Sequence, residues 1–251
     1  MLPDLEHLYL RHARGLDLVC SFLDRARVGT LGPGLIGCDS WAWAYLAYVW
    51  RGWLPTPLTL QAYDGVLLAD CFRRLAERPS ALQARFRQSD DGSDVLPPSE
   101  ETTSEHFSSD FLHHLATHSR GNLGVAWALW RAALCSEPLP SLAGDAHRDQ
   151  HIAGRTIWVT PWERMEHPAI PSGAGRNTAL VLHALLLHDG LTTALVRTLL
   201  SIEGNRATEV LDALRVAGVI SLHEDYWRVT PAGYPSAREF LAANGYLTDA
   251  F

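Results

Sequence analysis

Apolar positions recur at every third or fourth residue along much of the chain, which is the spacing of a buried helix face. This spacing predicts five helices in the first half of the chain, at residues 4–26, 41–53, 60–78, 104–119 and 119–134. Gly15 is expected to break the first helix, and Thr59 is expected to cap the third. This half of the chain is therefore predicted to be mainly helical.

Short apolar runs beside turn residues predict strands instead. Residues 32–40 carry the sequence "GPGLIGCDS", which predicts a buried strand that ends at the polar residues Asp39 and Ser40. Further strands are predicted within residues 81–104 and at residues 155–162. Because one predicted helix precedes the strand at residues 32–40 and another follows it, this part of the chain is typical of an α/β unit.

The last third of the chain has the most regular pattern. It predicts four helices and one hairpin, at residues 178–190, 192–204, 205–219, 220–233 (the hairpin) and 235–247. Asn205 is expected to cap the third of these helices, and Gly218 is expected to follow its end. Three helices, a hairpin and a final helix in this order predict a winged helix-turn-helix domain at residues 176–251.

The composition is typical of a globular cytoplasmic protein. Apolar residues make up 47% of the 251 residues, which is enough to fill a core. The most apolar run, residues 41–50, is too short to cross a bilayer, and the N-terminal residues predict no signal peptide. The four cysteines form no C-x-x-C pair, as expected for thiols in a reducing compartment. No membrane partner is expected.

The charged residues exclude several classes of activity. A net charge of -7 argues against broad electrostatic attraction to nucleic acid or to anionic lipid. All 21 basic residues are arginine, so this chain contains neither a Schiff-base lysine nor a P-loop lysine. The chain also has no G-x-S-x-G hydrolase elbow.

Residues 119–130, "SRGNLGVAWALW", place a polar cluster at the start of an apolar helix. Unpaired backbone N–H groups at a helix start attract anions, and Arg120 would strengthen that attraction. The alternative is a plain helix start that Ser119 or Asn122 caps, with Arg120 in solvent. The composition of the stretch favours the plain start.

The order of these elements resembles the C-terminal half of a bacterial AAA-type ATPase of the larger P-loop class. The strand "GLIGCDS", the helices after it, the stretch "SRGNLGVAWALW" and the winged helix follow one another as in that family. The resemblance implies that Asp39 or Ser40 stands at the sensor-1 position and that the helix start near Arg120 belongs to the lid that carries sensor 2. It implies four parts, a partial α/β segment (residues 1–58), a helical lid-like region (59–136), a proline-rich connector (137–175) and the winged-helix domain (176–251).

The chain departs from this family at the nucleotide site. It has no G-x-x-x-x-G-K-[ST] motif and no apolar strand that ends in Asp-Glu to hold magnesium. Gly124 stands where the family places the sensor-2 arginine. Asp39, Ser40 and Arg120 are therefore expected to be vestigial nucleotide contacts, and the isolated chain is expected to lack catalytic activity. Binding of ATP is expected only together with a complementary P-loop subunit.

The predicted function is a non-catalytic module of such an ATPase, which docks on an ATPase core or on another protein partner. The alternative is a winged-helix regulator that binds DNA through its third helix. The residues expected to contact DNA or the partner are Arg197, Arg206, Arg215 and Arg228. Residues 176–251 contain six arginines and eight acids, and the hairpin turn is acidic, so docking is favoured over DNA binding.

Two histidine pairs have the i, i+4 spacing that can bind a metal ion on a helix. They are His114 with His118, and His147 with His151. A closed zinc site needs three or four ligands, and neither pair belongs to an H-E-x-x-H motif. Solvated histidines and no metal site are therefore predicted, and an enzyme that uses these histidines is a third hypothesis.

Overall fold

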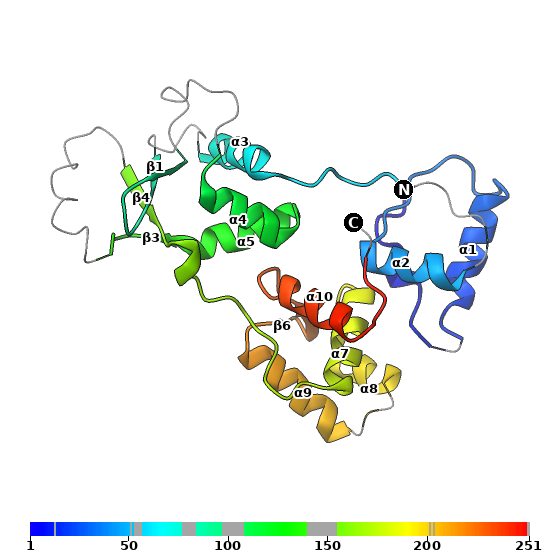
Figure 1. Ribbon diagram of the computed structural model, residues 1–251. Helices are drawn as coiled ribbons and strands as arrows, with labels where there is room; N and C mark the ends of the chain where they lie inside the picture. Colours follow the sequence, from blue (N-terminus) through cyan, green and yellow to red (C-terminus); the bar gives the residue numbers. More distant parts are fainter. Residues whose placement is uncertain are drawn as a thin grey trace. The chain divides into compact units, whose positions relative to one another are not determined.

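The computed structural model describes residues 1–12, 14–50, 52, 57–76, 84–96, 108–139, 155–200, 202 and 204–249 (Figure 1). It is a mixed α/β structure with more helix than strand, as the apolar spacing predicts. The contacts divide the chain into two compact units. The first unit joins residues 1–59 to residues 168–251, and the second unit covers residues 60–167. Among the described residues, no helix combines the length and the apolar character that crossing a membrane requires.

The first unit is mainly helical and contains one small sheet. Its described elements are η1 (Leu5–Leu8), α1 (Asp17–Arg27), α2 (Ser40–Val49), α7 (Arg176–Leu187), β5 (Leu191–Thr192), α8 (Thr193–Leu199), α9 (Gly204–Val216), β6 (Ile220–His223), β7 (Tyr226–Val229) and α10 (Tyr234–Ala243). Strand β7 lies between β5 and β6 and pairs with both in the antiparallel direction. The helices and the hairpin predicted in the last third of the chain are therefore confirmed, but the predicted N-cap at Asn205 is wrong, because α9 begins at Gly204 and Asn205 lies within the helix.

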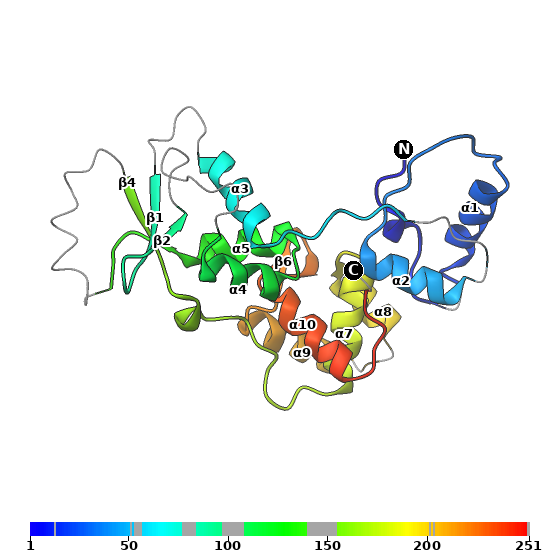
Figure 2. The same cartoon turned by 45° about the horizontal axis from the view of Figure 1, so that its top comes forward.

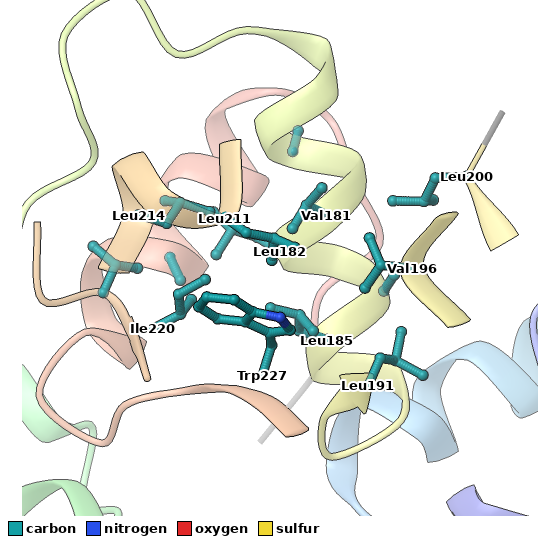
Figure 3. Close-up of a cluster of buried hydrophobic side chains, with 14 of the residues drawn as sticks. Val181, Leu182, Leu185, Leu191, Val196, Leu200, Leu211, Leu214, Ile220 and Trp227 are labelled. Carbon is teal, nitrogen blue, oxygen red and sulfur yellow. The ribbon is translucent and has the colours of Figure 1, made fainter. Parts of the chain in front are cut away.

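Helix α7 lies in the middle of the apolar core of the first unit (Figure 3). Leu182 and Leu185 of α7 lie beside Leu211 of α9 and beside the indole of Trp227 on β7 (Figure 3). Burying a leucine side chain of this kind contributes about 2 kcal/mol to folding. The helix is apolar around most of its circumference because other elements of the first unit cover it on several sides.

The turn between β6 and β7 is built from two residues with left-handed backbone. Glu224 has φ of 49° and Asp225 has φ of 68°. Two consecutive left-handed residues give a turn whose twist matches the right-handed twist of the paired strands. The strands pair from Ile220 with Val229 to His223 with Tyr226, so the two acids stand at the end of the hairpin.

The strand predicted at residues 32–40 is wrong. Ile36 forms only a single bridge with Leu2, and the side chain of Leu35 is 64% exposed. Three glycines and a proline surround these two apolar residues, so the stretch buries too little surface to hold a strand. Asp39 and Ser40 consequently stand at the start of α2 and not at the end of a strand.

The second unit contains a four-stranded sheet with helices beside it. Its described elements are α3 (Gly65–Ala76), β1 (Ala84–Gln88), β2 (Asp94–Leu96), α4 (Asp110–Ser119), α5 (Leu123–Ala133), β3 (Leu134–Cys135), β4 (Arg155–Val159) and η4 (Trp162–Arg164). The strand order is β2-β1-β4-β3, in which β1 and β4 are parallel and the outer pairs are antiparallel. Figures 1 and 2 show α4 and α5 side by side. The described part of residues 59–136, a range expected to resemble a helical lid, thus contains three strands as well as three helices.

Helix α3 begins later than its apolar spacing suggests, and the predicted N-cap at Thr59 is wrong. Asp64 stands at the helix start, and its Oδ1 accepts the N–H of Leu67 at 2.8 Å. Leu58 and Leu60 are almost fully exposed, so the apolar spacing before Asp64 does not mark a buried helix face.

The indole of Trp130 joins the elements of the second unit. Its ring lies 5.0 Å from the ring of Phe72 on α3, 5.3 Å from Phe86 on β1 and 5.9 Å from Phe111 on α4. Aromatic rings at such distances add stabilisation beyond the burial of their area. One tryptophan of the stretch 119–130 is therefore a core residue of this unit.

Candidate functional site

Asp39, a predicted nucleotide contact, is the N-cap of α2. Its Oδ1 accepts the N–H of Trp41 at 2.8 Å, and its own N–H donates to Oε2 of Glu6 at 3.0 Å. Burial raises the pKa of Asp39 to about 6, opposed by the hydrogen bond from Trp41 and assisted by the charge of Glu6. These hydrogen bonds of Asp39 serve the local structure of the first unit.

Ser40 belongs to a hydrogen-bonded group around the buried carboxylate of Asp249. Its Oγ donates to Oδ2 of Asp249 at 3.1 Å, and the hydroxyl of Tyr234 donates to the same oxygen at 2.9 Å. Arg238 donates from Nε to Oδ1 of Asp249 at 2.8 Å. The hydroxyl of Ser40 therefore links the start of α2 to the C-terminal segment.

Arg120 ends helix α4 in the second unit. It has a left-handed backbone with φ of 54°, and its N–H donates to the carbonyl of Thr117 at 3.1 Å. Its side chain is exposed. The three predicted nucleotide contacts are therefore split between the units, with Asp39 and Ser40 in the first and Arg120 in the second.

The polar stretch before α5 is a turn between two helices that ends in a cap. Oδ1 of Asn122 accepts the N–H of Val125 at 3.1 Å, so Asn122 is the N-cap of α5. Gly121 has φ of 75°, and a Cβ there would lie 2.6 Å from the backbone nitrogen of Tyr63. This close approach explains the glycine, and the geometry supports the plain helix start.

Replacing Asn122 with alanine is expected to lower the free energy of unfolding of the second unit by about 1 kcal/mol, because the N–H of Val125 loses its acceptor. Asn122→Asp retains an acceptor oxygen and is expected to stay close to the wild-type stability. Hydrogen exchange of the α5 amides measures this change. Equal protection in Asn122→Ala and in the control Asn205→Ala, an exposed position within α9, would contradict the cap.

The four arginines predicted to contact DNA or a partner are all exposed, and they come from three elements. They are Arg197 on α8, Arg206 and Arg215 on α9, and Arg228 on β7. Arg215 lies 3.6 Å from Oδ1 of Asp212, and Nε of Arg228 donates to the carbonyl of Asp189 at 3.0 Å. Two of the four arginines thus lie beside acidic residues, which weakens their field toward a nucleic acid.

The hairpin of β6 and β7 presents an apolar and acidic surface that the sequence analysis did not identify as a site. Leu222, which pairs with Trp227, is 49% exposed on one face of the hairpin, and Tyr226, which pairs with His223, is 44% exposed on the other face. The exposed acids Glu224 and Asp225 form the turn between them. We call these residues, together with His223, the wing surface. Exposed large apolar side chains next to charged ones are typical of sites that contact other proteins.

A second feature of the first unit is a cavity of about 650 Å³ between the N-terminal segment and the strands β5 and β7. Glu6, Tyr9 and His188 line it, together with Asp189 and Arg228. Glu6 is only 7% exposed and His188 only 3% exposed. The sequence analysis did not identify these residues, because Glu6 stands between Leu5 and His7 in a mixed stretch and His188 only follows the apolar run at residues 184–187.

Arg11 donates to two buried histidines, His183 and His188, which are neutral mainly because of their burial. Its Nη1 lies 2.8 Å from Nδ1 of His183, and its backbone N–H donates to Nε2 of His188 at 3.3 Å. Arginine has only donors, so both ring nitrogens accept, and each ring carries its proton on the other nitrogen. Burial, and to a lesser extent the charge of Arg11, lowers the pKa of both histidines to about 4, while nearby backbone groups act in the opposite direction.

The histidine pair at His114 and His118 is part of an aromatic group in the second unit. His118 lies 4.8 Å from His167, measured between ring centroids, and His114 stacks on Trp162. The described residues contain no group of three or more side chains placed to hold a metal ion. His147 and His151 lie outside the described residues.

Comparisons with known proteins add nothing to this geometry. No family model matches the chain, and the curated proteins and the solved structures searched contain no match. The function must therefore be inferred from the residues of the chain itself.

Proposed function

We propose that residues 176–249 form a winged helix-turn-helix module that docks on a protein partner through the wing surface. The order helix, strand, two helices, hairpin and helix, with a three-stranded antiparallel sheet, supports the winged-helix part of this proposal. The observation that carries the docking part is the exposure of Leu222 on one face of the hairpin and of Tyr226 on the other, beside the acidic turn, where a partner that encloses the hairpin tip would contact both.

The chemistry of the wing surface suits a protein better than DNA. A DNA-binding wing needs positive charge to neutralise phosphates, whereas Glu224 and Asp225 would repel them. Arg228, the nearest arginine in sequence, donates a hydrogen bond to the carbonyl of Asp189. Tyrosine, in contrast, is enriched among the residues that dominate protein interfaces.

The charge of the wing surface also indicates what the partner presents. Two acids at the turn, with Leu222 and Tyr226 on the two faces of the hairpin, are complementary to a small apolar groove that takes the hairpin tip and has arginine or lysine at its rim. A P-loop ATPase subunit is one candidate partner under the resemblance to AAA-type ATPases. Any ATP bound in such a complex would be held by that subunit.

DNA binding remains the second candidate because of α9. This helix carries two exposed arginines, Arg206 and Arg215, which flank its buried face, and a winged helix contacts the major groove with the corresponding helix. Glu209 and Asp212 occupy the same helix and are also exposed. The DNA function therefore predicts binding that weakens steeply with salt and is lost in Arg206→Gln and Arg215→Gln.

The docking proposal is tested with a photoreactive amino acid in place of Leu222, introduced into the full chain in its native cells. The same amino acid at Ser172, an exposed position of the first unit, is the matched control. We expect a cross-linked protein with the probe at position 222 and none with the probe at position 172. That protein is then purified, and its affinity for the unlabelled chain is measured by calorimetry.

The affinity measurement decides whether the wing surface itself makes the contact. Leu222→Ser and Tyr226→Ser are expected to weaken binding about tenfold or more, because each removes an apolar side chain from the interface. Val28→Ser is the control, since Val28 is 65% exposed elsewhere in the first unit. Unchanged affinity in both wing variants would reject the proposal, and salt-sensitive binding to random duplex DNA would favour the alternative.

A further inference from the structure

We propose that the cavity between the N-terminal segment and strands β5 and β7 binds a small organic cation with an apolar body. The cavity measures about 650 Å³, which is within the usual range for sites that take small molecules. It lies wholly within the first unit, since its lining residues come from residues 6–18 and from residues 188–228. The proposal does not depend on the docking function, although Tyr226 belongs both to the wing surface and to the cavity lining.

The carboxylate of Glu6 supplies the reason for a positive charge on the ligand. Glu6 is 7% exposed, and Oε2 accepts the N–H of Asp39 at 3.0 Å. Among the described residues, no arginine or histidine lies within ion-pair distance of Glu6. A buried carboxylate is stabilised by a nearby cation, and the cavity is the space in which a ligand would supply one.

The other charged groups of the cavity do not replace that missing cation. Arg228 lies 3.8 Å from Oδ2 of Asp189 and donates to its backbone carbonyl at 3.0 Å, so these two side chains largely balance each other. His188 is neutral near pH 7, because its pKa is lowered to about 4. Glu6 therefore leaves one negative charge unbalanced in the cavity lining, apart from the exposed His7.

The walls of the cavity indicate the rest of the ligand. Most of the uncharged lining residues are apolar, namely Leu8, Leu10, Leu18, Leu191, Leu195 and Tyr226. Apolar walls around a few polar groups favour a ligand with an apolar body, and the polar groups set its orientation. His188 is 97% buried and also lines the cavity, where its imidazole ring adds a polar group among the apolar side chains.

Three probes of nearly equal shape separate the effect of charge from that of apolar contact. Tryptamine, tryptophol and indole-3-acetate share an indole body and carry positive, zero and negative charge at neutral pH. Calorimetry on the full chain is expected to show that tryptamine binds about tenfold or more tightly than tryptophol, with indole-3-acetate weaker still. Equal affinity for all three probes, or no binding of tryptamine, would overturn the proposal.

Variants and spectra then place the bound probe. Glu6→Gln keeps an acceptor for the N–H of Asp39 but removes the charge, so tryptamine is expected to bind it no more tightly than tryptophol does. Glu239→Gln is the matched control, because Glu239 is exposed on α10. Tryptamine should also shift the imidazole resonances of His188 in the wild-type chain. Binding without that shift, or with equal affinity for Glu6→Gln, would also overturn the proposal.

Discussion

Replacing Asp249 with alanine is expected to lower the free energy of unfolding of the first unit by about 3 to 5 kcal/mol. The side chain of Asp249 is only 5% exposed and pairs with Arg238, which is 15% exposed, at 2.8 Å. Removing the carboxylate would leave the guanidinium of Arg238 buried without its counter-charge. The hydroxyls of Ser40 and Tyr234 would lose an acceptor as well.

The effect is expected to spread beyond the C-terminal segment, because these contacts join distant parts of the chain. Tyr234 also accepts the indole N–H of Trp41 at 3.0 Å, so one hydrogen-bonded group links α2 with α10 and with residue 249. Hydrogen exchange should therefore show weaker protection in α2, α7 and α10 together, since helix α7 packs against both of the others.

The control for Asp249 is an acid in an exposed ion pair. Asp212 lies 3.6 Å from Arg215, and both side chains are more than half exposed. Asp212→Ala is expected to change stability by less than about 1 kcal/mol, because solvent screens the pair. A loss in Asp249→Ala that is no larger than the loss in Asp212→Ala would show that the buried pair does not hold the first unit together.

The elements confirmed from the sequence are those whose burial pattern is set by near neighbours along the chain. The hairpin at residues 220–223 and 226–229 follows from alternating side chains on either side of a polar turn. The helices α7 to α10 follow from apolar spacing and from their breaks at glycine. The winged-helix interpretation of these elements stays a prediction.

No spacing in the sequence predicts the contacts between distant segments. The hydroxyl of Tyr9 donates to the carbonyl of Leu187, 178 positions away, and Arg11 reaches His183 across 172 positions. These contacts place residues 1–59 with residues 168–251, whereas the sequence analysis treated the two stretches as separate parts. Periodicity records which face of a helix is buried, but not which segment covers it.

The polar residues of the candidate sites were missed for a related reason. Glu6, His183 and His188 are all buried, but only His183 lies inside an apolar run, where a single polar side chain does not change the helical spacing. Asp39 was predicted at the end of a strand and Asn122 at a helix start, but the roles of both depended on geometry. In the structure each side chain accepts a backbone N–H of the helix that follows it.

The first unit is expected to lose stability as the pH falls from 6.5 toward 4, because its two buried histidines resist protonation. Above pH 6.5 both histidines are neutral in the folded and in the unfolded chain, so they cause no loss of folding stability there. Between the unfolded pKa of 6.5 and the folded pKa of about 4, the unfolded chain binds protons first. Each histidine then costs about 3 kcal/mol of stability over this range.

Asp39 acts in the opposite direction over nearly the same range. Burial raises its pKa from 3.8 to about 6, so the folded chain binds this proton before the unfolded chain does. Stability from Asp39 is present below pH 3.8 and is lost as the pH rises through 6. As the pH falls, protonation of Asp39 therefore adds about 3 kcal/mol to the free energy of unfolding. This gain offsets the loss from one histidine, so the net loss is about that of the other histidine.

Two substitutions that keep the hydrogen bonds to Arg11 isolate the histidine contribution. His183→Asn retains an acceptor near the position of Nδ1, and His188→Gln retains one near Nε2, but neither side chain binds a proton in this pH range. We expect each single variant to remove about half of the histidine effect. In the double variant the slope of stability against pH should change sign, because Asp39 is then the one group left of the three that bind protons in this range.

Urea unfolding followed by hydrogen exchange in α7 at pH 4.5, 5.5 and 6.5 would measure the slope, with the exposed His223→Gln as control. An acid loss in the double variant equal to that of the wild type would place the acid-sensitive groups elsewhere in the chain.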